Sequence, residues 1–308
     1  MPLAHAHSVA DGAPEQLPAG AGLLLEWTFD PTFLLPLLLA WLYFRGLRAY
    51  RRKGGRRFPA WRPVAFAAGL GIVALALLSP IDLLADFSFF WHMVQHMMLT
   101  LAGVPLLLLG APFLPVVWGL PEGIRRRGFV PLAKFPPLRW GVLWVTRPIP
   151  GLLLYVFTLW AWHHPTLYNA ALAERSVHYL EHLSFMVMAV LFWWNVVTPY
   201  PFRSRMHYLI RMAYIFLATV QNSALGALLA LSGGVWYAYA ALEGFWGLTM
   251  AEDQLLGGAM MWFGGVMMHL AALLAVFVVY AREEERNAPV AVIPDPENAP
   301  HVTRSPPA

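Results

Sequence analysis

The chain has 308 residues, of which 59% are hydrophobic and 12% are charged, and its net charge is +4. Soluble domains are about 45–50% apolar and about 25% charged, so this composition excludes a soluble globular protein and indicates an all-α integral membrane protein. The sequence contains no cysteine, which excludes disulfides, thiolate catalysis and cysteine-based metal sites.

Seven stretches are apolar enough to cross a bilayer, which takes about 20 helical residues. We therefore predict a seven-transmembrane-helix bundle within a membrane domain over residues 31–280. Residues 1–30 are predicted to form a polar outward tail, and residues 281–308, which begin with acidic residues and are rich in proline, a disordered cytoplasmic tail. In chain order the stretches are 31–47, 63–80, 88–109, 149–163, 176–198, 209–231 and 254–280.

The distribution of basic residues predicts the orientation of the chain. Lys and Arg concentrate in the loops after the first, third and fifth stretches, and the densest cluster, over 45–62, contains no acidic residue. Under the positive-inside rule these loops are cytoplasmic, so the N-terminus is predicted to face outward and the C-terminus to face the cytoplasm. We interpret the basic clusters as topology signals beside the lipid bilayer. Because the basic segments are short, no nucleic-acid partner is expected.

Histidines gather at the predicted outer ends of three helices. The segment WHMVQHMML places His92 and His96 four residues apart, and HYLEH does the same for His178 and His182. Residues four apart lie on one helical face with Cβ atoms about 5–6 Å apart, close enough for both imidazoles to bind one ion. Together with a third outer histidine from the 163–164 pair, they predict a metal or cofactor site near the outer membrane surface.

Acidic residues near these histidines are predicted to assist the site. Asp82 and Asp86 lie in the short outer turn before the third stretch, and Glu181 lies beside His182. Each is expected to add an oxygen ligand or to orient an imidazole. Imidazole suits both copper and zinc; the outward face and the lack of cysteine favour copper, with zinc as the alternative. The methionines next to the first pair are interpreted mainly as residues that fill core gaps: Met93, Met97 and Met98.

Four segments carry a resemblance to a known family. The longest, SPIDLLADFSFFWHMVQHMMLTLAGVPLLLLGAP at 79–112, resembles the signature of CtaG-type cytochrome c oxidase assembly factors, which are bacterial seven-span membrane proteins. The similarity extends over about residues 25–280. It continues in WAWHHPTLYNAAL at 160–172, VHYLEHLSFMVMAVLFWWNVV at 177–197 and DQLLGGAMMW at 253–262.

The resemblance implies a function and a set of ligands. The pattern W-H-x-P matches His163 rather than His164 to the family's histidine, so the implied metal ligands are His92, His96, His163, His178 and His182. The implied function is maturation of cytochrome c oxidase at the bacterial inner (plasma) membrane, as a metallochaperone that supplies copper to the oxidase centre beside the haem. The implied partners are the oxidase subunit that carries this copper–haem centre and other copper chaperones.

Two other classes of function stay open. A zinc-dependent seven-span hydrolase would use Ser79, Asp82 and the first histidine pair, but such enzymes carry another pair in the last span, where this chain has only His269. A haem or quinone protein would use one histidine from each of two helices at matched depth. Because Pro80 is sufficient to explain Ser79 as a turn or helix end, no nucleophile–base pair is evident and the chain is not expected to be an enzyme. The roles of His5, His7, His164 and His269 stay open.

Overall fold

The structure is a computed structural model. It describes residues 27, 31–52, 58–202, 206–239 and 247–288. The segment with His5 and His7 therefore lies outside the described residues, and so do residues 289–308 of the predicted cytoplasmic tail. The last helix continues past Tyr280 to Asn287.

Regular structure in the described ranges is entirely helical. A 3₁₀ turn, Pro31–Phe33, precedes the first helix. Three π-helical segments occur, of which η4 (Met98–Gly103) joins α4 to α5, η5 (Arg125–Phe129) joins α7 to α8, and η7 (Met260–Gly264) joins α14 to α15. The α-helices are α1 (Leu34–Arg52), α2 (Trp61–Leu78), α3 (Pro80–Phe87), α4 (Phe89–Met97), α5 (Val104–Leu109), α6 (Phe113–Gly119), α7 (Glu122–Ile124), α8 (Val130–Lys134), α9 (Pro136–Val145), α10 (Pro148–Trp162), α11 (Pro165–Ala173), α12 (Arg175–Val197), α13 (Tyr208–Leu231), α14 (Met250–Ala259) and α15 (Gly265–Asn287).

Several of these helices are long and apolar enough to span a membrane, which confirms a helical membrane protein. Among the described residues there are six such spans, or up to seven if α9 and α10 count as one span bent by 72°. The predicted stretch 149–163 corresponds to α10, whose 15 residues are fewer than the about 20 that a bilayer requires. Pro148 starts a new helix there because its fixed φ suits the first helical position. The six spans are Pro31–Arg52, Trp61–Leu78, Phe89–Leu109, Arg175–Val197, Tyr208–Leu231 and Met250–Asn287.

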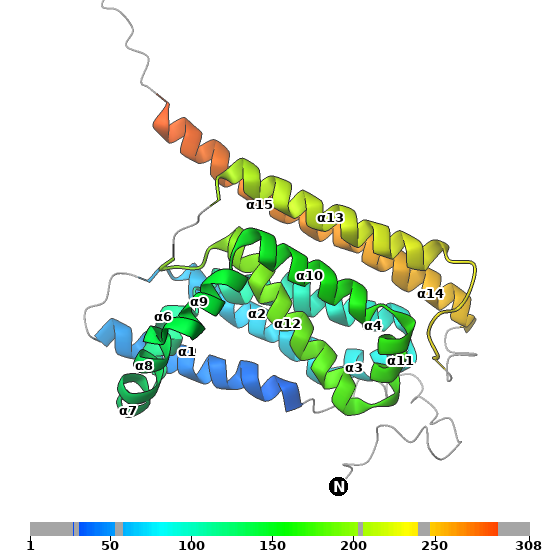
Figure 1. Ribbon diagram of the computed structural model, residues 1–308, viewed down its shortest axis with the longest axis horizontal. Coiled ribbons are helices and arrows are strands. Elements are labelled where there is room, and N and C mark those ends of the chain that lie inside the picture. Colours follow the sequence, from blue (N-terminus) through cyan, green and yellow to red (C-terminus); the bar gives the residue numbers. More distant parts are fainter. Residues whose placement is uncertain (1–26, 28–30, 53–57, 203–205, 240–246, 289–308) are drawn as a thin grey trace, which may run out of the picture.

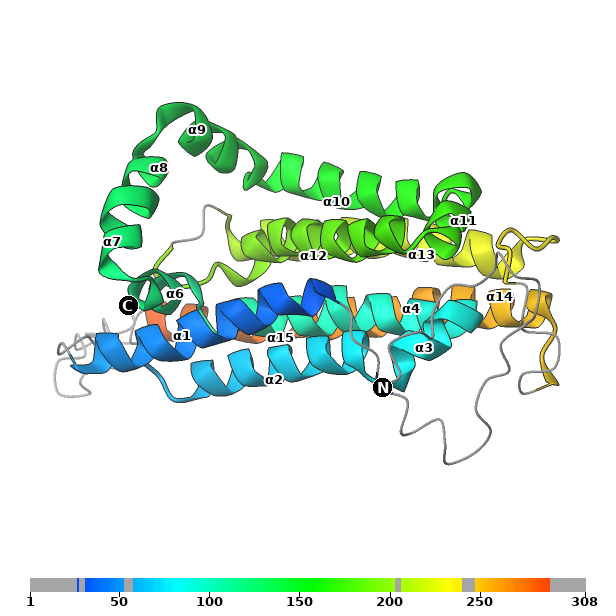
Figure 2. The ribbon, with the colours of Figure 1, turned by 90° about the horizontal axis from the view of Figure 1, so that it is seen from below.

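The long helices run side by side, and their ends form two distinct groups (Figures 1 and 2). Helices α3, α4, α11 and α14 meet at one end of the molecule, whereas α6 to α9 lie at the other. Within the bundle α10 packs against α12, α13 packs against α14 and α15, and α1 packs against α6. The histidine-bearing segments therefore share the first end.

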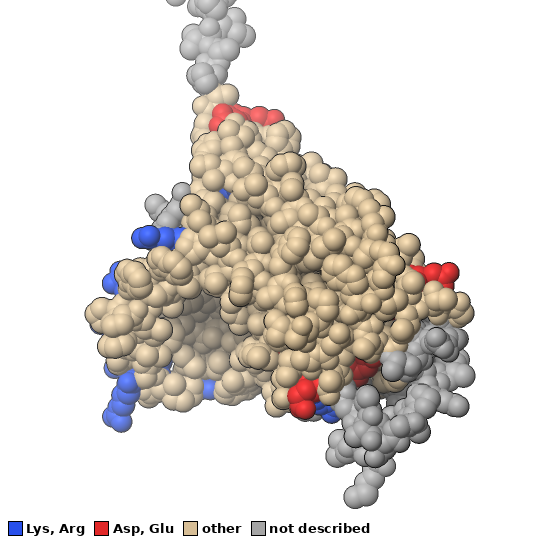
Figure 3. Space-filling model, turned by 45° about the vertical axis from the view of Figure 1, so that its right-hand side comes forward, with Lys and Arg blue, Asp and Glu red and all other residues tan. Residues whose placement is uncertain are grey.

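Charged side chains separate along the same axis. Figure 3 shows Lys and Arg mainly at the α6–α9 end, while acidic residues lie mainly at the opposite end and at the end of α15. This separation matches the alternation of basic loops along the sequence and keeps most basic residues, with Arg175 as an exception, away from the histidine-bearing end.

Two π-helical segments are stabilised from neighbouring helices. A π turn leaves backbone carbonyls without their usual helical partners. Trp193 of α12 donates from Nε1 to Thr100 O in η4 at 2.8 Å, and Asn222 of α13 donates from Nδ2 to Met261 O in η7 at 2.9 Å. The widened turns are therefore held in place by interhelical hydrogen bonds.

Candidate metal centre

Helices α4 and α12 bring the two histidine pairs together. The Nε2 atoms of His92 and His96 lie 2.9 Å apart. The rings of His92 and His178 have centroids 5.2 Å apart, and those of His96 and His182 have centroids 5.7 Å apart. All four side chains are buried. The spacing of four residues on each helix thus produces one compact imidazole cluster between the two helices.

Glu181 lies within this cluster. Its Oε2 is 3.7 Å from His92 Nε2 and its Oε1 is 3.8 Å from His96 Nε2. The residue is fully buried, and neither carboxylate oxygen has a hydrogen-bond partner among the described residues. A buried carboxylate in that condition is costly unless a cation neutralises it. The side chain therefore suits a metal ligand.

Two overlapping groups of ligand atoms have the dimensions of a metal site. In each group the ligand atoms lie within 4.8 Å of one another. Imidazole nitrogen and carboxylate oxygen form a donor set that suits copper and zinc, so the residues fit the predicted ion. The first group is His92, His96 and His182, and the second is His92, His178 and Glu181.

Two buried phenols lie on the Nδ1 side of the His92 ring, where one contacts His92 and the other contacts the first phenol. Tyr239, in the connection between α13 and α14, places its hydroxyl 3.1 Å from His92 Nδ1, and the hydroxyl of Tyr168 in α11 contacts that of Tyr239. Burial raises the pKa of both phenols well above the ordinary value, so both stay neutral. A hydrogen bond at Nδ1 fixes the orientation of the ring and leaves Nε2 directed at the cluster.

The two aspartates that the sequence placed together have different neighbours. Asp86 Oδ1 lies 3.8 Å from His178 Nδ1, whereas Asp82 accepts a hydrogen bond from Gln95 Nε2 at 2.7 Å. Gln95 also donates to Ala76 O at 2.8 Å. Asp86 therefore adjoins a candidate ligand, while Asp82 helps to attach α4 to α2 and α3.

The start of α4 is fixed by a buried carboxylate from α14. Asp253 accepts hydrogen bonds from Ser88 Oγ at 2.7 Å and from the backbone N–H of Phe89 at 2.7 Å. Ser88 in turn accepts from the backbone N–H of Trp91. Because a helix N-terminus carries partial positive charge, a carboxylate there is stabilising. The first histidine pair follows directly and is therefore positioned relative to α14.

His163 lies apart from both groups of ligand atoms. Its Nδ1 is 2.7 Å from Leu159 O, within the last turn of α10, and its Nε2 is 3.4 Å from the Sδ atom of Met93. His164 is exposed, and its Nδ1 accepts from the backbone N–H of Thr166 at the start of α11. The structure thus gathers four of the five predicted ligands and places the fifth against a thioether.

The remaining predicted residues have structural partners. Ser79 bonds through its hydroxyl to Leu75 O and accepts from the backbone N–H of Ile81, as expected for the cap of α3. His269 is buried in α15, with Nδ1 2.9 Å from Gly265 O. Within the described ranges neither residue forms a hydrogen bond with the imidazole cluster, so the triad suggested by the hydrolase alternative is not assembled.

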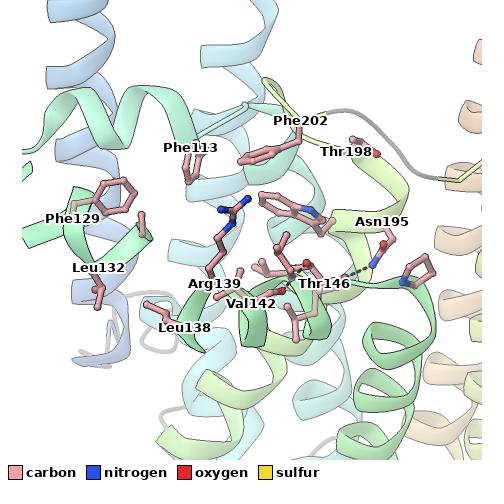
Figure 4. Close-up of a pocket in the computed structure, with 16 residues that line it drawn as sticks. Phe113, Phe129, Leu132, Leu138, Arg139, Val142, Thr146, Asn195, Thr198 and Phe202 are labelled. Atoms are coloured by element: carbon pink, nitrogen blue, oxygen red, sulfur yellow. Dashed lines mark hydrogen bonds between the residues drawn. The ribbon is translucent and has the colours of Figure 1, made fainter. Parts of the chain in front are cut away.

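A large cavity lies at the other end of the molecule. It has a volume of about 710 Å³ and is bounded by α6, η5, α8, α9 and α12. Figure 4 shows Arg139 pointing toward Phe113 and Phe202 inside it, and Figure 3 shows the surface hollowed near the basic end. No histidine lines this cavity, so it is separate from the imidazole cluster.

Comparison with known proteins places the chain in a family. The model of the cytochrome c oxidase caa3 assembly factors (Caa3_CtaG) matches residues 41–283. Uncharacterised proteins of Mycobacterium bovis and Mycobacterium tuberculosis are each 26% identical to this chain, over 89% of it and 42% of their own length. One of Mycobacterium leprae is 22% identical, over 85% of this chain and 40% of its own length.

The chain thus spans about two fifths of the length of these mycobacterial relatives. No solved structure matches the chain. The family model, in contrast, covers most of the sequence and includes both histidine pairs, His163 and Glu181. This chain therefore belongs to the cytochrome c oxidase caa3 assembly factor family.

Proposed function

We propose that the protein binds copper at the cluster of His92, His96, His178, His182 and Glu181 and supplies it to the copper–haem subunit of cytochrome c oxidase. The observation that carries this proposal is the convergence of buried imidazole nitrogens on a buried carboxylate. Family membership supplies the connection to oxidase assembly. Copper is cargo in this function, and the oxidase is its recipient.

The donor set suits a carrier. Imidazole binds copper only when it is deprotonated, so binding and release couple to proton exchange. Thiolates, which hold copper more firmly, are absent from the sequence. For nitrogen and oxygen ligands, divalent copper binds more tightly than zinc, so copper is the proposed cargo and zinc the competitor in binding experiments.

The site is proposed to open toward the outer side of the bacterial plasma membrane. Helix α4, which carries the first histidine pair, lies at the end of the bundle opposite α6 to α9 (Figure 2), and most basic residues lie at the α6–α9 end (Figure 3). Basic loops face the cytoplasm. Reporter fusions test this orientation. A reporter after Glu174 is expected outside and one after Arg127 inside, and the reverse result would contradict both the orientation and the outward site.

Metal titration tests whether the histidine pairs form one site. If His96 and His182 share an ion, His96→Ala and His182→Ala each lower copper affinity by about 100-fold or more, and the double variant is little worse than either single one. Losses that add in the double variant would instead indicate two independent sites. His164→Asn is the matched control, because Asn keeps the helix cap and His164 lies outside the cluster.

Measurement in cells tests the recipient. A strain that lacks this protein, or that carries His178→Ala, is expected to make the oxidase polypeptides with a low copper content and low activity at limiting copper. The strain with His164→Asn is expected to resemble the wild type. Full copper content of the oxidase in the deletion strain would refute the proposed function.

A further inference from the structure

Helix α4 carries two parallel stripes of potential metal ligands. His92 and His96 form one stripe, and Met93 and Met97 form another, shifted by one residue. One residue corresponds to about 100° around a helix, so the stripes face different neighbours. The histidine stripe faces α12, as described above, and Met93 faces His163 at the end of α10.

In the contact between His163 and Met93, a nitrogen lone pair faces a sulfur lone pair, and neither atom carries a proton to donate. Because Nδ1 of His163 is 2.7 Å from Leu159 O, that nitrogen carries the proton and donates it to the carbonyl. Nε2 of the neutral ring then presents a lone pair to the Met93 sulfur at 3.4 Å, and a thioether sulfur has no proton to donate. Both side chains are buried, with exposed fractions of 3% and 2%.

A small cavity adjoins this contact. It has a volume of about 30 Å³, which exceeds the about 10–15 Å³ that a single water requires, so it has room for one ion. No carboxylate lines it, and the hydroxyl-bearing residues of its lining are Thr100 and Tyr155. Its potential nitrogen, sulfur and amide ligands are Met93, His96, Met97, His163, Asn222 and Met261.

The helices around the cavity are shaped to admit these side chains. A Cβ atom on Gly264 in η7 would come within 2.8 Å of Met97 Cε, so the glycine makes room for that methionine. The π segments η4 and η7 both adjoin the cavity, through Thr100 and Met261. Such π turns occur often at functional sites. Two long helices thus depart from regular geometry beside the same small space.

We infer that this cavity is a second metal site, specific for a soft monovalent ion, which takes Cu(I) through His163 Nε2 and Met93 Sδ. Met97 and Met261 are the further thioethers that line it. The inference rests on the proposed copper function and adds to it a chemically distinct site. Thioether ligands select Cu(I), and uncharged ligands suit a monovalent ion in a low-dielectric interior better than a divalent one.

His96 connects the two sites. Its Nε2 lies 2.9 Å from His92 Nε2 in the imidazole cluster, and the same side chain lines the small cavity. Its Nδ1 is buried and has no hydrogen-bond partner among the described residues. His96 is therefore the side chain that the two sites share.

X-ray absorption of the full-length protein loaded with Cu(I) tests the inference. The wild type is expected to show a sulfur shell around copper, and Met93→Leu is expected to lose it together with at least about tenfold in affinity for the additional Cu(I) ion. Leu replaces Met with little cost in packing. Met186, a buried methionine of α12, is not among the residues that line the cavity, so Met186→Leu is the control and is expected to keep the sulfur shell.

A second pair of variants separates this inference from the proposed function. His178→Ala disrupts the imidazole cluster and is expected to keep the sulfur shell, whereas His163→Gln is expected to lose it. No sulfur shell in the wild type, or a shell that persists in both Met93→Leu and His163→Gln, would overturn the inference. A retained shell with copper binding unaffected by changes in the imidazole cluster would instead overturn the proposed function alone.

Discussion

The carboxylate of Glu181 lies 3.7 Å from the Nε2 atom of His92, in a position where both residues are fully buried. A carboxylate without hydrogen-bond partners in the interior lowers the stability of the protein. The same negative charge stabilises a bound cation. The Glu181 carboxylate is therefore expected to raise copper affinity and to lower the stability of the copper-free protein.

Glu181→Gln tests the effect of this carboxylate on stability and on copper affinity. The substitution keeps the volume of the side chain and removes its charge, so we expect the copper-free variant to unfold at a higher temperature, with a free energy of unfolding about 1 kcal/mol or more above that of the wild type. Copper affinity is expected to fall by about 10–100-fold. Thermal unfolding in detergent, with and without copper, measures both effects.

Glu174→Gln serves as the matched control for Glu181→Gln. Glu174 is exposed at the start of α12, and its substitution is expected to change neither quantity. A Glu181→Gln variant that binds copper as tightly as the wild type would show that the carboxylate is not a ligand.

Tyr239 is expected to act through His92. Tyr239→Phe removes the hydroxyl 3.1 Å from His92 Nδ1 and keeps the aromatic ring. Loss of a partner behind a metal-binding histidine lowers metal affinity by about 10–100-fold, and competition with a chromogenic copper chelator measures this loss. Tyr200→Phe, at an exposed position, is expected to leave affinity unchanged. Equal affinity in wild type and Tyr239→Phe would assign the phenol a packing role only.

Asp253 is expected to contribute mainly to stability. Asp253→Ala removes the acceptor for Ser88 Oγ and Phe89 N and leaves both donors buried, so we expect a loss of about 2–3 kcal/mol in the free energy of unfolding. Asp253→Asn keeps one acceptor oxygen and is expected to lose less. Thermal unfolding measures the series, with Glu252→Gln as the exposed neighbouring control. An unchanged midpoint of thermal unfolding in Asp253→Ala would contradict the stabilising role that we assign to Asp253 at the start of α4.

Much of the architecture was predictable because it depends on local patterns. Apolar length identified helices that are now confirmed as candidate spans, and the quoted motifs identified the family, which the comparison confirms. The spacing of four residues predicted which imidazoles share a helical face. Glu181 was predicted to add an oxygen ligand or to orient an imidazole, and it lies three residues after His178, a separation that also places it on the same face.

The remaining features depend on contacts between distant parts of the chain. Tyr239 reaches His92 from the connection after α13, and Asp253 reaches α4 from α14. No local spacing predicts either contact. The bend before α10 was signalled by Pro148, but whether α9 completes the span depends on packing. His163 was grouped with the other histidines by motif, whereas its position at the end of α10 directs it to Met93.

Asp86 and Asp82 are expected to differ in effect although the sequence gives them similar positions. Asp86→Asn weakens the carboxylate that lies 3.8 Å from His178 Nδ1, so we expect copper affinity to fall by about tenfold. Asp82→Asn leaves an oxygen to accept from Gln95, and Asp82 belongs to neither group of ligand atoms, so a small loss of thermal stability is expected with a smaller loss of affinity than in Asp86→Asn. Parallel copper titration and thermal unfolding of the two variants measure this contrast. Equal losses of affinity would show that both aspartates act on the cluster, and loss only in Asp82→Asn would reverse the assignment.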